Sequence, residues 1–440
     1  MIIENSPKEW KRRIEKLSEE VHKRSRGRLE TIFFGILFAH GKRTVTSWLK
    51  AAGITKGYQE YYFFLNSLGK HYYEKIADKL CEMVLRVALW NSKEMVGVID
   101  DSPTRRFGPK VEGAGKHHDH TTKPTDQKFF YGHVWVTLAL ILKHCWYGTI
   151  ALPLLSKLYI RKKDVKELPK EYGWKFKTKL VLAWELVEWL YEKCIKWGKD
   201  LWILTDGGYS KGDFLKKIPK DVKFVGRLRR DAALRTLPEK RKPHQKGRTP
   251  VYGKKRIHLR RRAGQERGWQ TAMVGGKERK FKAFQATYRH VKGPILVVMV
   301  SFPNGTWAPY FCTDSQAEPI KVLEKIFDRC AIEDNFKEVK ETLGAGEQQV
   351  RNLWSNIACW HLCLWSYVLV YLWSWRKSHT VLVDRKNAPW DSTGRRPSLK
   401  DRMAALRLCF WEPAISDFKP KTPKLQKFKE ALLTLFRIPA

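Results

Sequence analysis

The sequence predicts a mixed α/β sheet flanked by helices, with a helical domain before the sheet and a β-rich subdomain inserted into it. Three observations lead to this fold class. Helical patterns dominate residues 1–85, short apolar runs alternate with a helical stretch over residues 94–206, and a basic segment then leads into β-rich stretches. A chain of 440 residues can bury a full core and hold several such units.

We expect residues 1–90 to form a helical DNA-binding domain. Runs such as LETIFFGILFAH and YYEKIADKLCEMVLRV are typical of helices in length and apolar pattern. Between them, GKRTVTSWLKAAGI has the length and basic character of a helix-turn-helix. A plain helical bundle explains the same pattern, so both interpretations stay open.

Residues 91–226 are expected to form the first part of the sheet domain. EMVGVID (94–100) is short, apolar and β-branched and ends on an acid, which indicates a buried strand. YGHVWVTLALIL and TIALPLLSKLYI indicate two more strands, and KTKLVLAWELVEWLYEKCIKW has a helical period. DLWILTD (200–206) is again a short apolar strand that ends on Asp.

The β-rich insertion is predicted over residues 227–315. It begins with a loop dense in Lys and Arg and continues through β-rich stretches, namely RIHLRRR, FKAFQATYRHV, PILVVMVSF and WAPYFCT. The sheet domain resumes over residues 316–375, with one helix over residues 319–344 that stops at Gly344. Residues 376–440 complete the chain as a C-terminal helical region.

Residues 352–375 contain no Asp, Glu, Lys or Arg and are long enough to span a bilayer. Polar residues interrupt the segment, and its Trp residues are spread along it instead of gathering at two interfaces. A buried core helix is therefore favoured, and no membrane partner is expected. The N-terminus lacks the apolar core of a signal peptide and the eight Cys show no CxxC spacing, which favours a reducing cytoplasm.

The charge of the chain indicates a polyanionic partner. It has 85 Lys and Arg against 45 Asp and Glu, a formal net charge of +40 that would repel itself in a compact fold. Nucleic acid is favoured over an anionic membrane surface, because aromatic residues on which bases can stack accompany the charge.

Three acids are the candidate catalytic residues. Asp100 and Asp206 each close a predicted buried strand, where an unpaired carboxylate is costly unless a metal ion or a base neutralises it. Glu333 lies on the predicted helix, with cations on the same face: Arg329, Lys337 and Lys340. Such carboxylates are suited to two Mg²⁺ ions, for which Mn²⁺ can substitute, in phosphodiester cleavage. Ordinary strand-end and helix-surface acids would give the same pattern.

Several stretches resemble the DDE transposases of bacterial insertion sequences, in the order of that family: VIDDSPTRRFGPKVEGAGKHHDH, YGHVWVTLAL, LTDGGYSKGDFL, VGRLRRDAAL, GRTPVYGKKR and IEDNFKEVKETLGAGEQQVR. They are most similar to the group whose RNase H-like core carries a β-rich insertion before the final Glu. The resemblance implies an RNase H-like sheet in which Asp100, Asp206 and Glu333 hold the metal ions. Asp101 is the alternative to Asp100 as the first ligand.

The last signature of that family is a Tyr, an Arg, a Glu and a Lys at fixed spacing. Arg329, Glu333 and Lys340 keep the spacing, whereas Ile326 occupies the Tyr position. The resemblance implies that the Tyr and the Arg contact phosphate near the cut and that the element is released through a DNA hairpin. Ile326 leaves the hairpin step open.

Further DNA contacts are expected from the insertion. The resemblance implies an aromatic platform for a flipped base, for which Trp307 and Trp269 are the candidates, with a packing role equally compatible. A basic cluster is expected to hold the DNA backbone: Arg229, Arg230, Lys254, Lys255, Arg260, Arg261 and Arg262. Residues 117–120 (HHDH) are expected to form a flexible loop that touches DNA, in preference to a zinc site. Cys359, His361 and Cys363 are expected in the core.

The resemblance implies a cut-and-paste DNA transposase, a nuclease and strand transferase. It would act on the double-stranded ends of its element and on target DNA, as a homodimer in the synaptic complex, in the bacterial cytoplasm at the nucleoid. Two other classes remain open: a domesticated or inactive DNA-binding protein that keeps the fold, and a membrane-associated protein that rests on residues 352–375 alone.

Overall fold

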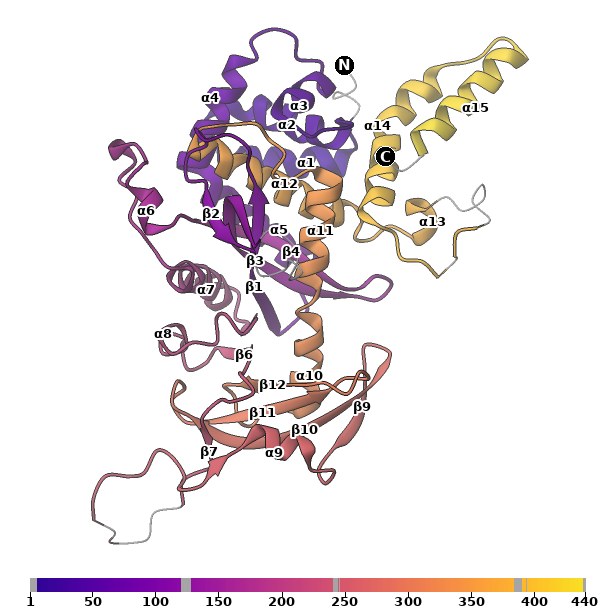
Figure 1. Cartoon of the computed structure of the whole chain (residues 1–440). Helices are drawn as coiled ribbons and strands as arrows, with labels where there is room; N and C mark the ends of the chain where they lie inside the picture. The colour runs from indigo at the N-terminus through magenta and orange to yellow at the C-terminus, as the bar shows by residue number, and fades with distance from the viewer. Residues whose placement is uncertain are drawn as a thin grey trace.

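A single twelve-stranded mixed sheet runs through the computed structural model, which describes residues 6–119, 128–239, 244, 246–383, 390–392 and 394–437. The strand order is β2-β3-β1-β5-β6-β12-β11-β10-β7-β8, with β4 paired to β3 and β9 paired to β10. Figure 1 shows helices gathered around one end of this sheet and the later strands at the other end. The fold class is the α/β class expected from the sequence.

The core of the sheet is built around β1. This strand pairs antiparallel with β3 and parallel with β5, and β5 in turn pairs parallel with β6. The strands of this part are β1 (Glu94–Arg105), β2 (Gly115–His118), β3 (Phe129–His144), β4 (Gly148–Tyr159), β5 (Asp200–Thr205) and β6 (Lys223–Arg227). They form a mixed sheet in which β1 and β5 lie side by side in parallel.

Both faces of this sheet are covered, which explains why its strands are continuously apolar. Met95 and Ile99 of β1 belong to the larger hydrophobic cluster, which includes α7 (Lys179–Lys196). Val96 and Val98 point the other way into a second cluster with α10 (Pro319–Asp328) and α11 (Ala331–Leu343). The alternation follows from the two-residue period of a strand.

The N-terminal helices pack on the core rather than standing apart from it. They share the larger hydrophobic cluster with the sheet, and α4 and the π-helical η3 contact α12 (Leu353–Ser374). Their bounds are α1 (Lys8–Ser18), η2 (Lys23–Ser25), α2 (Arg26–Phe38), α3 (Val45–Ala51), α4 (Gln59–Ser67), η3 (Leu68–Tyr72) and α5 (Tyr73–Ala88). The domain boundary at residue 90 stays a prediction.

Helix α12 is long and apolar enough to cross a membrane, yet the whole of its most apolar window is buried inside the protein. Asn352 caps its first turn by accepting from the backbone N–H groups of Trp354 and Ser355. Several of its polar side chains have partners within the fold: His361 accepts from the backbone N–H of Ser156, and Trp365 donates to the carbonyl of Leu154. The expected core helix is confirmed, with Cys359, His361 and Cys363 fully buried.

The β-rich insertion continues the core sheet. β12 pairs antiparallel with β6, where Tyr310 faces Arg227 and Cys312 faces Val225. The insertion contains β7 (Leu234–Arg235), β8 (Arg256–Ile257), α9 (Leu259–Gly264), β9 (Gln270–Val274), β10 (Lys277–Tyr288), β11 (Pro294–Ser301) and β12 (Trp307–Cys312). Figure 1 shows these elements beneath α10.

Four local expectations were wrong. β1 continues beyond Asp100 to Arg105, because its pairing with β3 extends further than its pairing with β5. Residues 115–118 pair with β3 as strand β2 instead of forming a loop, while His120 lies outside the described residues. Most of RIHLRRR is helical, as α9. The predicted helix 319–344 is two helices, because the chain turns between Asp328 and Ala331.

The remaining helices are short connections or belong to the C-terminal region. They are α6 (Lys162–Val165), η4 (Lys170–Tyr172), α8 (Gly212–Leu215), α13 (His379–Leu382), α14 (Leu399–Asp417) and α15 (Pro423–Arg437). Figure 1 shows α14 and α15 together at the side of the molecule.

Candidate active site

The three predicted acids lie together in one pocket of about 640 Å³. They come from distant parts of the chain: Asp100 from β1, Asp206 from the residue after β5, and Glu333 from the first turn of α11. The fold therefore brings together side chains that are up to 233 positions apart. The pocket also contains four arginines, which are Arg227, Arg229, Arg230 and Arg329.

The parallel register of β1 and β5 places the two aspartates at the same level. The last registered pair is Ile99 with Thr205, so Asp100 and Asp206 are the next residue on each strand. Asp100 is thus the first residue of β1 that is not paired with a residue of β5. Ligand sites at the carboxyl ends of parallel strands form in this way.

Asp100 and Asp101 point to opposite sides of β1, as successive strand residues do. Asp100 lines the pocket, whereas Asp101 accepts hydrogen bonds from Tyr209 Oη and Lys179 Nζ. Asp101 is therefore occupied by partners outside the pocket. Of the two candidates for the first acid, only Asp100 faces Asp206 and Glu333.

Arg329 bridges two of the three acids. Its Nη1 lies 3.3 Å from Asp100 Oδ2, and its Nη2 lies 2.8 Å from Glu333 Oε1. Burial opposes the charged guanidinium, but the negative charges of Asp100 and Glu333 raise the pKa of Arg329 above its usual value. Arg329 is the C-cap of α10 and has helical backbone angles, so Glu333, four residues later, lies within reach of its side chain.

The pKa of Asp100 is raised to about 7, first by burial and then by the negative charge of Asp206. A buried carboxylate whose pKa is raised by a neighbouring carboxylate is in an environment that a divalent cation relieves, and oxygen donors are what Mg²⁺ prefers. No group of three or more His, Cys, Asp or Glu among the described residues is close enough to hold a metal ion. The guanidinium of Arg329 stands between Asp100 and Glu333 instead. The donor set fits the metal, and Arg329 must shift to admit it.

A family model described as DDE superfamily endonuclease matches residues 16–293, well over half of the 440 residues. The chain belongs to the DDE superfamily endonucleases. Asp100 and Asp206 lie within the matched range, and Glu333 lies beyond it. The family implies nuclease activity and, for its acidic residues, divalent metal ions.

Other comparisons add little to this assignment. None of the curated proteins compared with the endonuclease matches it. Among solved structures it is similar to piggyBac transposase in a synaptic complex with hairpin DNA, with a TM-score of 0.37 and 11% identity. That alignment covers 100% of this chain and 84% of the other. A TM-score at this level does not by itself establish a shared fold.

The endonuclease places only part of the predicted DNA-binding set at the pocket. Arg229, Arg230 and Arg329 line it. Trp307 lies beside it at the start of β12, with the guanidinium of Arg230 5.2 Å from its ring centroid and donating to its carbonyl. The other predicted residues do not line it, and these are Lys254, Lys255, Arg260, Arg261, Arg262, Lys337 and Lys340.

Two of these outlying cations are packed against the protein. Arg262 lies with its guanidinium 4.0 Å from the ring centroid of Phe284. Burial lowers the pKa of Lys340 to about 8, against the opposing charge of Asp119. Lys337 is exposed on α11 one turn after Glu333. Trp269, the second candidate platform, is covered by Lys282 at 4.8 Å.

Arg227 and Tyr310 line the pocket but did not stand out in the sequence. Arg227 is the last residue of β6, just as Asp206 comes directly after β5. Asp206 was singled out by its place at the end of a predicted strand, and the same observation applies to Arg227. Tyr310 is brought to the pocket by its pairing with Arg227 across β6 and β12. This antiparallel pairing of β6 with β12 joins the core sheet to the insertion. No residue pattern near either strand indicates it. Ile326, by contrast, is buried in the second hydrophobic cluster and is absent from the pocket.

Proposed function

We propose that this endonuclease is a DNA transposase that moves an insertion sequence by cut and paste at terminal inverted repeats. The observation that carries the proposal is the convergence of Asp100, Asp206 and Glu333 in a pocket that also contains four arginines. Carboxylates supply the ligands for hard cations, and guanidinium groups bind phosphate oxygens in two-point contacts. A pocket with both is suited to a phosphodiester of DNA.

The three carboxylates would hold two divalent cations, Mg²⁺ or Mn²⁺, whose chemistry is to activate the attacking water or 3′-OH and stabilise the departing oxygen. Arg227, Arg229 and Arg230 would bind and orient the phosphate. Arg329 would release Asp100 and Glu333 and turn to the same phosphate. The same side chains would serve both reactions: hydrolysis, in which water attacks the phosphodiester, and strand transfer, in which the freed 3′-OH attacks it.

The remaining parts of the proposal follow from the resemblance of the sequence and from its charge. The N-terminal helices would bind the element ends, and the basic insertion would hold backbone phosphates of double-stranded DNA. Two ends must be brought together, so a homodimer is the proposed synaptic assembly. The bacterial cytoplasm, at the nucleoid, is the proposed location.

Cleavage of DNA that carries the element ends tests the proposal, with Asp206→Asn and Glu333→Gln as the variants. Each should bind the ends as the wild type does and lose Mg²⁺-dependent cleavage by about a thousandfold or more, because a lost ligand removes several kcal/mol of charge stabilisation. Asp334→Asn, which changes the neighbouring carboxylate on the same helix but outside the pocket, is the matched control and should cleave normally. Cleavage retained in Asp206→Asn or Glu333→Gln would remove that acid from the mechanism.

A DNA-binding protein that keeps the fold without activity is the second candidate. It predicts end binding without strand transfer in the wild-type protein, so a strand-transfer assay on its own ends separates the two. The intact set of three acids in one pocket favours the enzyme.

A further inference from the structure

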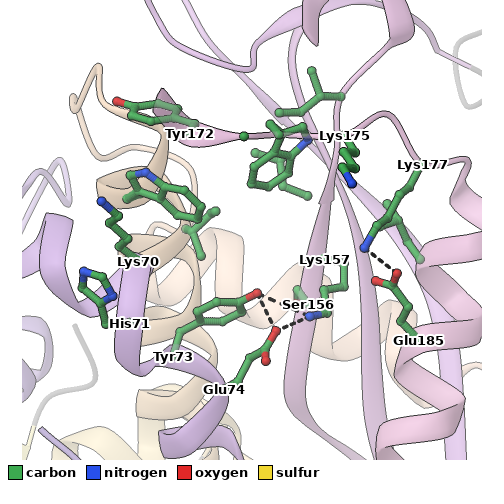
Figure 2. A pocket seen from close by; sticks show the side chains of 17 residues that line it. Lys70, His71, Tyr73, Glu74, Ser156, Lys157, Tyr172, Lys175, Lys177 and Glu185 are labelled. Carbon is green, nitrogen blue, oxygen red and sulfur yellow. Dashed lines mark hydrogen bonds and ion pairs between the residues drawn. The ribbon is translucent and has the colours of Figure 1, made fainter. Parts of the chain in front are cut away.

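A second cavity, of about 440 Å³, shares no residue with the catalytic pocket. It lies where η3 and α5, the end of β4, the segment 172–177 and the start of α12 meet (Figure 2). Its volume falls within the range of small-molecule sites. The roles assigned above to the three acids and the arginines do not use it.

Aromatic rings form much of its wall. The cavity is lined by Tyr73, Tyr172, Trp174 and Trp354, all partly buried. The ring of Trp354 has its centroid 5.6 Å from both Tyr172 and Trp174, at interplanar angles of 61° and 57°. Rings that meet at such angles leave faces open to a planar guest. Stacking on indole and phenol faces is how proteins hold unpaired bases.

The cavity also carries a surplus of positive charge. It contains four lysines and two glutamates, and both glutamates are already paired: Glu74 with Lys157, and Glu185 with Lys177. The other two lysines, Lys70 and Lys175, are exposed and have no ion-pair partner among the described residues. His71 adds a further titratable group at the rim. Figure 2 shows Lys70 and His71 on one side of the cavity and Lys175 and Lys177 on the other.

We propose that this cavity binds a nucleotide, with the base against Trp174 and Trp354 and the phosphate at Lys70 or Lys175. The guest must be planar to use the aromatic faces and anionic to use the two free lysines, and a nucleotide combines both features. An apolar guest would leave the lysines unused. An inorganic anion would leave the rings unused.

The same chemistry is offered by a free mononucleotide and by an unstacked nucleotide of a DNA strand. One short segment connects the cavity with β1, on the side away from the catalytic pocket: Lys177 lines the cavity, and Lys179 forms an ion pair with Asp101, next to Asp100. A strand nucleotide as the source rests on the proposed function, because it needs DNA on the protein. A free mononucleotide does not.

Titration calorimetry of the full-length protein with dAMP is the first arm of the test. Wild type should bind dAMP more tightly than ribose 5-phosphate, which lacks the base. Trp174→Leu and Lys175→Gln should each weaken dAMP binding by about tenfold, the effect of one stacking or charged contact. Lys292→Gln removes an equally exposed lysine on the β10–β11 turn, outside the cavity, and should leave binding within about twofold.

Fluorescence anisotropy with a labelled single-stranded oligodeoxyadenylate is the second arm, run without divalent cations. A loss of oligonucleotide affinity in Trp174→Leu and Lys175→Gln, absent in Lys292→Gln, identifies a strand nucleotide as the guest. A loss confined to dAMP identifies a free mononucleotide. If neither probe distinguishes the cavity variants from Lys292→Gln, the proposal is wrong. Neither arm measures cleavage, so a failure of the proposed catalytic function does not change the outcome.

Discussion

At the scale of the residue, Arg329 decides the state of the pocket. Its guanidinium forms ion pairs with both Asp100 and Glu333 and lies between the two carboxylates. Burial and the charge of Asp206 raise the pKa of Asp100, and the positive charge of Arg329 opposes this rise. In the proposed function, the same group would become available for phosphate when the carboxylates bind cations.

We therefore expect Arg329→Ala to lower the stability of the metal-free protein by about 1–3 kcal/mol, the range for hydrogen bonds to charged groups. Without the competing guanidinium, Mg²⁺ should raise the melting temperature of the variant more than that of the wild type. Thermal unfolding with and without Mg²⁺ measures both effects.

Arg229→Ala is the control, because Arg229 lines the same pocket but pairs with Asp231. Its Mg²⁺ shift should equal that of the wild type. A Mg²⁺ shift in Arg329→Ala that is no larger than in the wild type would contradict the role of Arg329 as a substitute for the cation.

At the scale of the element, close packing of η3 on α12 ties the N-terminal helices to the core. Gly69 of η3 lies against the start of α12, and a Cβ at this position would overlap the carbonyl oxygen of Trp354. Backbone cannot move aside as a flexible side chain can. The contact therefore requires glycine for its lack of a side chain.

Gly69→Ala should destabilise the protein by about 1–3 kcal/mol, the usual cost of overpacking. Gly27→Ala is the matched control, since Gly27 lies in α2 with no atom within 4 Å of an added Cβ. There alanine should be neutral or stabilise by up to about 1 kcal/mol through helix propensity. Chemical denaturation of both variants compares the two sites. Equal stabilities would show that η3 can move away from α12 at no cost.

At the scale of the whole molecule, buried histidines set the stability in acid. Burial lowers the pKa of His361 to about 4 and that of His133, which also faces Arg106, to about 3. His361 accepts from the backbone N–H of Ser156 and its other ring nitrogen donates to the carbonyl of Ile357, so its ring is neutral. Unfolding exposes both rings, whose pKa then returns to about 6.5.

The unfolded state therefore binds more protons than the folded state below pH 6.5. Stability is complete above that pH and falls as the pH drops from about 6.5 to about 4, by up to about 1.4 kcal/mol per pH unit for each histidine. His361→Gln should remove one such contribution and flatten the dependence by that amount. Urea unfolding at a series of pH values measures the slope. The exposed His22→Gln is the control, and an equal slope in all three proteins would exclude His361 as a source of acid instability.

The main elements of the core could be predicted from residue patterns. EMVGVID and DLWILTD are strands because their apolar, β-branched residues are covered on both faces. The buried α12 followed from its interrupting polar residues. The turn at Arg329 was missed because residues 319–344 keep a helical period across it. Residues 115–118 were missed because their partner strand begins only eleven positions after His118.

Local patterns in the sequence determined the fold class, the three candidate acids and the strongly positive net charge, since each can be read from neighbouring residues or from composition. Which of Asp100 and Asp101 faces the pocket was decided by the register of β1 between β3 and β5. The places of Arg227 and Tyr310 were decided by the join of β6 to β12, and the position of Arg329 by the turn between two helices. Each of these features depends on how segments that are far apart in the chain pair or pack. The sequence of one segment alone does not specify that geometry.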